Sequence, residues 1–167
     1  MTRRFISGSL LALVALTLLL PATARGQDSP VLVLYQSPMD TWVEDPFRPP
    51  AHIGASGNRG LMYAASEGQA VRAAAPGRVA FAGQVGVRIV ITVEHDDGIR
   101  TTYTGLSRIQ VGRGDQVLAR QVMGVAIARF HFGARIRDHY LDPQVLLDAS
   151  ETQMRARLVP PGGAIEE

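Results

Sequence analysis

The chain has 167 residues, of which 46% are hydrophobic and 19% charged, and it contains no cysteine. This length supports one domain with its own hydrophobic core. The lack of cysteine excludes a disulfide framework and a cysteine-based zinc site. All 17 basic residues are arginine, they form no clustered basic stripe, and aromatic residues are few, so nucleic acid is not an expected partner.

Residues 1–26 have the pattern of a signal peptide. Arg3 and Arg4 precede an apolar run at 5–20, and the A-T-A at 22–24 fits a small-x-small cleavage site. An uncleaved membrane anchor is the alternative, but the run is short for a span and ends in proline and small residues. Cleavage would remove three arginines and lower the formal net charge from +2 to −1. We therefore expect a secreted, extracytoplasmic protein with no stable membrane span.

Proline-rich or polar segments flank the predicted domain, which we place at residues 42–148. Residues 27–41 are interpreted as a linker, with the apolar run at 31–35 as a candidate edge strand. Residues 149–167 end in P-P-G-G-A-I-E-E and predict a polar tail, with a short helix at 150–158 as an alternative.

Between positions 68 and 128 the pattern favours strands joined by tight turns. Short runs rich in Val, Ile and Thr are bounded by Gly and Asp, and the D-D-G at 96–98 predicts a hairpin. The first helical signal is P-Q-V-L-L, which begins at Pro143. Two stretches, 67–77 and 113–124, share a layout that indicates an internal repeat or two similar hairpins. The sequence predicts an all-β, mainly antiparallel domain.

Four motifs follow one another in this domain. They read N-R-G-L-M-Y-A-A at 58–65, E-H-D-D-G-I-R-T-T-Y-T-G-L-S at 94–107, V-G-R-G-D-Q-V-L-A-R-Q-V-M-G at 111–124, and F-H-F-G-A-R at 130–135 with Y-L-D-P after it. In the same order they resemble H-R-G-x-D-x-A-A, H-x-x-G-x-x-T-x-Y-x-H-L-S, V-x-x-G-x-x-V-x-x-G-Q-x-I-G and H-x-H-F-E-x-R with D-P. These are the motifs of lysostaphin-type, or LytM-like, zinc metalloendopeptidase domains, a family of peptidoglycan hydrolases. The resemblance covers about residues 42–147.

The resemblance implies a barrel-sandwich fold built on a duplicated half, which agrees with the predicted strands and the repeat. It also implies a zinc ion held by the His and Asp of H-x-x-x-D and by the second His of H-x-H. In the family, the first His of H-x-H and the His before L-S assist in cleaving peptidoglycan peptides.

At the corresponding positions this chain has different residues. Asn58 and Met62 stand where the family has its first two zinc ligands, and His131 is the only retained ligand. Arg129 and Gly105 stand where the family has its two catalytic histidines. The resemblance therefore implies a vestigial groove at Asn58, Met62, Arg129 and His131, with no catalytic residue, no bound zinc and no other cofactor.

The chemistry of the substituted residues agrees with this loss. Asn58 offers only a neutral amide oxygen, and the thioether of Met62 suits Cu(I) better than zinc and also fills gaps in a core. Arg129 carries a permanent positive charge, and at about 4 Å and a dielectric constant near 20 it would repel a divalent cation by roughly 8 kcal/mol. Without zinc no hydroxide nucleophile is generated at neutral pH.

Other histidines offer one alternative. His52 lies in a loop before Asn58, and a rearranged site could combine it with His131 and with Glu44 or Asp45. His95 is expected to be structural, because many family members have a histidine just before this hairpin turn. His139 is expected at the surface or in a turn.

Three functions follow as hypotheses. The first is an exported, non-catalytic (pseudo-peptidase) domain that binds peptidoglycan or regulates a cell-wall hydrolase, as degenerate members of the family do. The second is an active zinc metalloendopeptidase that cleaves peptidoglycan peptides through the rearranged site. The third is a purely structural exported domain. In each case the protein is expected to be extracytoplasmic, and the first two place it at the cell wall.

Overall fold

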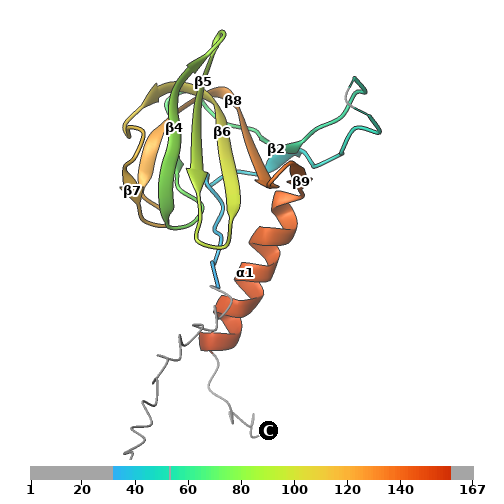
Figure 1. Ribbon diagram of the computed structural model, residues 1–167, viewed down its shortest axis with the longest axis vertical. Helices are drawn as coiled ribbons and strands as arrows, with labels where there is room; N and C mark the ends of the chain where they lie inside the picture. Colours follow the sequence, from blue (N-terminus) through green and yellow to red (C-terminus); the bar gives the residue numbers. More distant parts are fainter. Residues whose placement is uncertain (1–31, 53, 159–167) are drawn as a thin grey trace, which may run out of the picture.

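The structure is a computed structural model that describes residues 32–52 and 54–158 (Figure 1). The predicted signal peptide lies outside the described residues. The elements are β1 (Val43–Asp45), β2 (Gly60–Tyr63), β3 (Ala70–Arg72), β4 (Gly77–Val85), β5 (Arg88–Glu94), β6 (Ile99–Ile109), β7 (Gln116–Val117), β8 (Val122–Ile136), β9 (His139–Leu141) and α1 (Pro143–Leu158). The long strands stand side by side, and α1 extends away from β9 past the lower end of the sheet (Figure 1).

The strands form one sheet in the order β1-β2-β8-β6-β5-β4-β7, and β3 and β9 pair with β8. Every pairing is antiparallel, which confirms the predicted fold class. The D-D-G hairpin is also confirmed, since it joins β5 to β6 with Gly98 at a φ of +80°. A left-handed backbone of this kind favours glycine.

Side chains alternate between the two faces of the long strands, as the pleat requires. On β8, Phe130, Phe132 and Ala134 are buried in the core. They pack with residues from the neighbouring strands, including Tyr103 of β6, whose ring lies 5.3 Å from that of Phe132. The intervening residues of β8 face the opposite side of the sheet, and this second face carries the candidate site.

The two stretches with a shared layout occupy equivalent places in the fold. Gly68 and Gly114 both have positive φ, and each precedes a short strand. β3 then pairs with β8, while β7 pairs with β4, so each short strand joins the long strand of the other half. This reciprocal pairing is what a duplicated half would produce.

The segment before residue 42 packs into the domain, whereas the sequence indicated a linker with an edge strand. Tyr35 and Met39 are buried, and residues 32–37 form no strand. The backbone N–H of Tyr35 instead donates to Ser150 Oγ (2.7 Å) and that of Gln36 to the Ala74 carbonyl (2.7 Å). Residues 35–39 of the predicted linker segment therefore pack against the domain.

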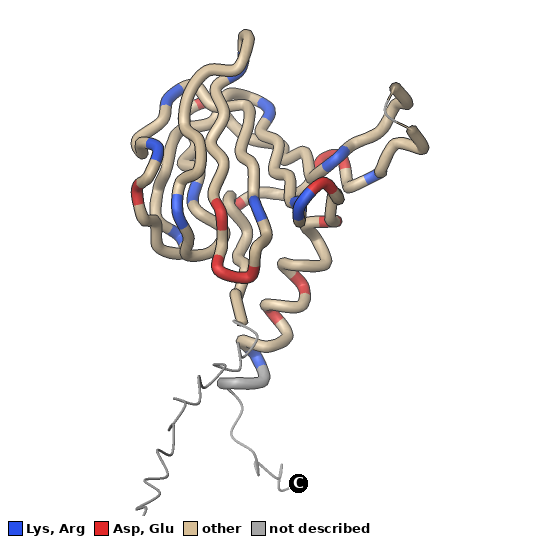
Figure 2. The backbone as a smooth tube through the Cα atoms, viewed as in Figure 1, with Lys and Arg blue, Asp and Glu red and all other residues tan. Residues whose placement is uncertain are grey.

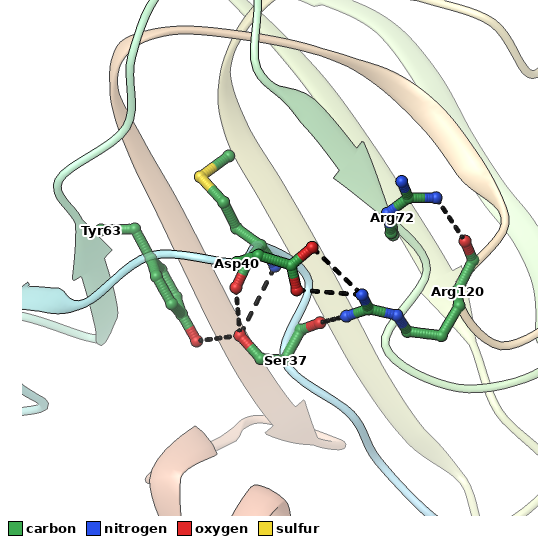
Figure 3. Close-up of polar contacts among 6 residues, drawn as sticks. Ser37, Asp40, Tyr63, Arg72 and Arg120 are labelled. Atoms are coloured by element: carbon green, nitrogen blue, oxygen red, sulfur yellow. Dashed lines mark hydrogen bonds and ion pairs between the residues drawn. The ribbon is translucent and has the colours of Figure 1, made fainter.

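Arg120 fastens this segment to the turn after β7 (Figure 3). Its guanidinium donates to the Ser37 carbonyl (2.8 Å) and to the Asp40 carboxylate (2.9 Å). The Ser37 hydroxyl donates to the Met39 carbonyl (2.7 Å), next to the Tyr63 hydroxyl (3.3 Å). These bonds hold the turn at 37–40 that places Met39 in the core.

The chain after Leu141 forms a 16-residue helix, α1, which includes residues 150–158, where the sequence left a short helix as the alternative to a polar tail. Asp142 accepts a hydrogen bond from the backbone N–H of Gln144 (2.9 Å) and caps the helix that Pro143 begins. Leu146 and Leu147 pack against the core, and Ser150 is buried. Residues 159–167 lie outside the described residues, and the domain boundaries at 42 and 148 remain a prediction.

No helix within the described residues is long and apolar enough to cross a membrane.

Candidate binding groove

One row of side chains crosses four neighbouring strands on the face opposite the core. Asp45 of β1 pairs with Met62 of β2, Met62 with His131 of β8, and His131 with Thr104 of β6. Directly paired residues of antiparallel strands point to the same face. The register therefore brings Met62 and His131, distant in sequence, next to each other.

A groove of about 780 Å³ lies over this row. All five residues singled out by the family motifs line it: Asn58, Met62, Gly105, Arg129 and His131. The other lining residues are Gly57, Arg59, Arg88, Thr92, Thr102, Ile127, Gly133, Ala134, Arg135 and Tyr140, together with Thr104. The structure thus gathers the five positions in one place, and adds Arg88, which lies outside the motifs, and Arg59 and Arg135, which lie within them.

Asn58 and His131 are joined by a hydrogen bond of 3.0 Å between Asn58 Oδ1 and His131 Nε2. Asn58 is buried, and its Nδ2 donates to the backbone carbonyls of Asp45 (2.9 Å) and Pro46 (3.1 Å). These two bonds fix the orientation of the amide, because carbonyls only accept. Asn58 Oδ1 therefore accepts, and His131 Nε2 carries the proton.

His131 is held in its neutral form. Burial lowers its pKa, the positive charge of Arg88 lowers it further, and Asp45 opposes the two effects. A neutral imidazole has one N–H, and here that N–H donates to Asn58 Oδ1. Nε2 is consequently unable to bind a metal ion without breaking this bond.

Arg129 lies at the rim of the groove with its side chain 66% exposed. Its nearest acid is Glu44 of β1, at 3.9 Å between Nε and Oε2, and the carboxylate is itself 51% exposed. Such a pair contributes little to stability and leaves the arginine free to turn toward another anion. Met62 is half-buried beside His131 and fills the floor of the groove between β1 and β8.

Gly105 lies at an irregularity in the pairing of β6 with β8. Its φ is +82°, and a Cβ atom added there would collide with the carbonyl oxygen of Arg129 and lie 3.1 Å from Phe130 Cα. The backbone at this position is therefore adapted to glycine, and a histidine would need the two strands to move apart.

The remaining histidines lie elsewhere. His95 is buried on the core side, with Nδ1 2.7 Å from the Pro76 carbonyl and Nε2 2.8 Å from the Thr101 hydroxyl. His139 is exposed on β9, and His52 is exposed in the loop before Asn58. Within residues 32–52 and 54–158, no three His, Cys, Asp or Glu side chains are grouped so that they could hold a metal ion.

The residues of the groove do not fit a catalytic zinc ion, which requires about three imidazole or carboxylate ligands. Only His131 is of that kind, and its Nε2 donates to an amide. The Asn58 oxygen is used by the same bond, and Arg88 and Arg129 add positive charge at the groove.

The family model of peptidase family M23 matches residues 56–143, more than half of the chain, and the chain therefore belongs to peptidase family M23. Solved structures of the same fold include the catalytic domain of lysostaphin from Staphylococcus simulans, at a TM-score of 0.58 and 24% identity over 65% of this chain and 92% of that one. SpoIIQ in its pore-forming complex with SpoIIIAH gives a TM-score of 0.63 and 22% identity over 75% and 98%. These likenesses show the fold alone.

Curated relatives with similar sequences include the murein hydrolase activator NlpD of Escherichia coli, 35% identical over 101 residues, which are 54% of this chain and 27% of the relative. Outer membrane antigenic lipoprotein B of Haemophilus influenzae is 33% identical over 95 residues, or 52% and 24%. The matched part thus spans about a quarter of the length of these relatives.

Sequence reasoning gave no role at the site to Arg59, Arg88 and Arg135, which line the same groove, although Arg59 and Arg135 lie within the quoted motifs. Arg135 could have been found, because it follows Arg129 and His131 at even spacing on one strand and therefore shares their face. Arg59 is stacked over the ring of Tyr140, 5.5 Å from its centroid, and Arg88 starts β5. The contact of Arg59 with Tyr140 and the position of Arg88 at the groove both depend on long-range strand pairing that no local pattern indicates.

Proposed function

We propose that this chain is an exported, non-catalytic member of peptidase family M23 that binds peptidoglycan or regulates a cell-wall hydrolase. The observation that carries the proposal is the hydrogen bond between Asn58 and His131. It joins two positions at which the family resemblance expects zinc ligands, and it occupies the imidazole N–H and the amide oxygen together. The polar groups at these two positions are therefore satisfied by each other without a metal ion.

The positions of the catalytic histidines support the same proposal. Arg129 has no proton to exchange at neutral pH, and Gly105 has no side chain. The alternative is an active endopeptidase with a rearranged site around His52 and His131. It finds no support in the described residues, where no group of metal-ligating side chains is formed.

The names of the relatives support the proposed role and location. One similar protein is a murein hydrolase activator and another is an outer membrane lipoprotein. A regulatory role in peptidoglycan cleavage, outside the cytoplasm, agrees with the export predicted from residues 1–26. Only about a quarter of each relative is matched, so the partner of this chain is part of the proposal.

The proposal is tested with the purified protein and isolated peptidoglycan sacculi. We expect less than one zinc ion per chain, an unchanged melting temperature with a chelator, and no peptide release by the protein alone. Sacculi should retain the protein in low and moderate salt, or peptide or glycan release by an added cell-wall hydrolase should rise in its presence.

Two results would overturn the proposal. Stoichiometric zinc together with peptide release, both lost in His131→Ala, would establish the active endopeptidase. If sacculi do not retain the protein and it has no effect on a hydrolase, the third possibility, a purely structural domain, would be left.

A further inference from the structure

The groove has an unusual balance of charge. Among the described residues, those that line the groove include four arginines and no Asp or Glu. The acidic pair Asp96–Asp97 lies at the turn between β5 and β6, whereas Arg88 starts β5 at the other end of that strand. Figure 2 shows acidic positions gathered at that turn. Negative charge is therefore concentrated away from Arg88.

Three of the four arginines are weakly compensated or uncompensated within the described residues. Arg129 has only the distant contact with Glu44, at 3.9 Å. Arg88 and Arg135 form no ion pair with a described acid, and Arg135 Nε is buried without a hydrogen-bond partner there. Asp45, the other acid of β1, is occupied by Arg48 at 2.9 Å. The groove thus has positive charge that the protein itself does not neutralise.

The floor between these arginines is made of small polar side chains. Thr92, Thr102 and Thr104 come from β5 and β6, and Gly133 adds no side chain at all. Thr102 pairs with both Thr92 and Gly133 across the sheet, so these residues form a continuous shallow surface. Hydroxyl groups here are able to donate to an anion or to a peptide carbonyl.

The size and the apolar parts of the groove favour a short peptide as its ligand. A volume of about 780 Å³ is in the usual range for small-molecule sites. Met62, Ile127 and Tyr140 provide contacts for methyl and methylene groups beside the arginines. Arginine binds carboxylates through paired N–H donors, and it does so more strongly where water is partly excluded.

We propose that the groove is a carboxylate receptor, in which Arg88, Arg129 and Arg135 bind the free carboxylates of a short peptide, as found in peptidoglycan stem peptides. This rests on the proposed function and names the ligand class of the same site. At position 129 a permanent positive charge stands where the family has a histidine, so this part of the groove attracts an anion rather than a cation. Recognition then depends on the charge of the peptide and weakens with salt.

The test uses stem peptides released from peptidoglycan by an amidase, and the same peptides with their carboxylates converted to amides, in titration calorimetry at two salt concentrations. Arg88→Gln and Arg135→Gln should each weaken binding of the free-acid peptide by about tenfold or more. Arg155→Gln is the matched control: Arg155 pairs with Glu151 on α1, does not line the groove, and should leave binding unchanged. The amidated peptides should bind at least tenfold more weakly to the unmodified protein.

Equal binding of free-acid and amidated peptides would overturn this inference, as would equal binding by the Arg88 variant and the control. Arg88 is exposed at a hairpin, so its variant remains informative if the Arg135 variant does not fold. If peptides do not bind while sacculi are retained or a hydrolase is stimulated, the inference fails and the proposed function stands. If Arg88→Gln abolishes stimulation without peptide binding, the ligand is an acidic segment of the hydrolase, and the peptide proposal is wrong.

Discussion

The side chains of Asn58 and His131 form a hydrogen bond of 3.0 Å in the groove, and the other polar side-chain atom of Asn58, Nδ2, donates to the backbone carbonyls of residues 45 and 46. One amide therefore connects the β1 segment to β8. Where a metalloenzyme would use an ion to tie such strands together, this chain uses neutral hydrogen bonds. Asn58 is consequently expected to matter more for stability than an exposed amide does.

Replacing Asn58 by alanine should lower the free energy of unfolding by about 2–4 kcal/mol, because it leaves two partly buried hydrogen-bonded carbonyls and the His131 N–H without their partner. The measurement is urea unfolding monitored by circular dichroism. Gln84→Ala is the control, since Gln84 makes a comparable bond to the Gly86 carbonyl (2.8 Å) at an exposed site and should change stability by less than about 0.5 kcal/mol. Equal effects of the two substitutions would contradict the connecting role of Asn58.

Restoring ligands should restore metal binding if the motif register is right. In the triple variant Asn58→His, Met62→Asp and Arg129→His, the residues introduced at 58 and 62 would join His131 as three zinc-type ligands, and the repelling charge at 129 would be gone. We expect about one zinc per chain by elemental analysis and a melting temperature that falls on chelation. Adding His131→Ala should remove the metal again. A triple variant that folds but binds no zinc would show that these positions are not equivalent to the family's ligands.

Gly105 should not tolerate any side chain. Gly105→Ala combines a left-handed backbone, which costs about 1–2 kcal/mol, with a collision against the Arg129 carbonyl, so a loss of about 3 kcal/mol or more is expected. Gly98→Ala separates the two effects, because Gly98 has nearly the same φ (+80°) but nothing within 4 Å of the added Cβ. It should cost only the backbone part. Similar losses at the two sites, measured by urea unfolding, would mean that the strands yield easily at Gly105.

Arg120 is expected to hold residues 37–40 in place through its hydrogen bonds to Ser37 and Asp40. Arg120→Ala should destabilise by about 1–2 kcal/mol and speed cleavage near residue 40 in limited proteolysis. Arg120→Gly loses the same bonds but relieves the positive φ of 66°, and should therefore be less destabilising. A loss no larger than that of the surface-pair variant Arg100→Ala would indicate that the segment is held by Met39 and Tyr35 alone.

Much of the sheet could be predicted because its information is local. Alternating β-branched residues, the D-D-G turn and the D-P before α1 each act within a few positions. The resemblance to the family motifs also indicated which positions lie together, because the motifs that contain Asn58, Met62 and His131 belong to the paired β2 and β8 region. The packing of Tyr35 and the contact of Arg120 with Asp40, 80 positions apart, depend on the finished fold. So does the gathering of Arg59, Arg88 and Arg135 with Arg129.

Stability should fall as the pH drops below neutrality, and His95 should account for part of the loss. Burial lowers the pKa of His95 in the folded protein, an effect that the Pro76 carbonyl and two nearby aspartates oppose only in part. The unfolded chain therefore binds more protons than the folded one at pH values below the unfolded pKa of about 6.5. The stabilisation is complete above that value and is lost as the pH falls through it toward the folded pKa.

The measurement is the free energy of unfolding in urea at pH 7.5, 6.5 and 5.5, above the range in which ordinary carboxylates titrate. His95→Gln should reduce the slope without abolishing it, because the pKa of His131 is lowered as well. His139→Gln, at an exposed position on β9, is the control and should preserve the slope of the unmodified protein. An unchanged slope in His95→Gln would show that the bonds of His95 to Pro76 and Thr101 accommodate the charged ring, and that its burial does not oppose protonation.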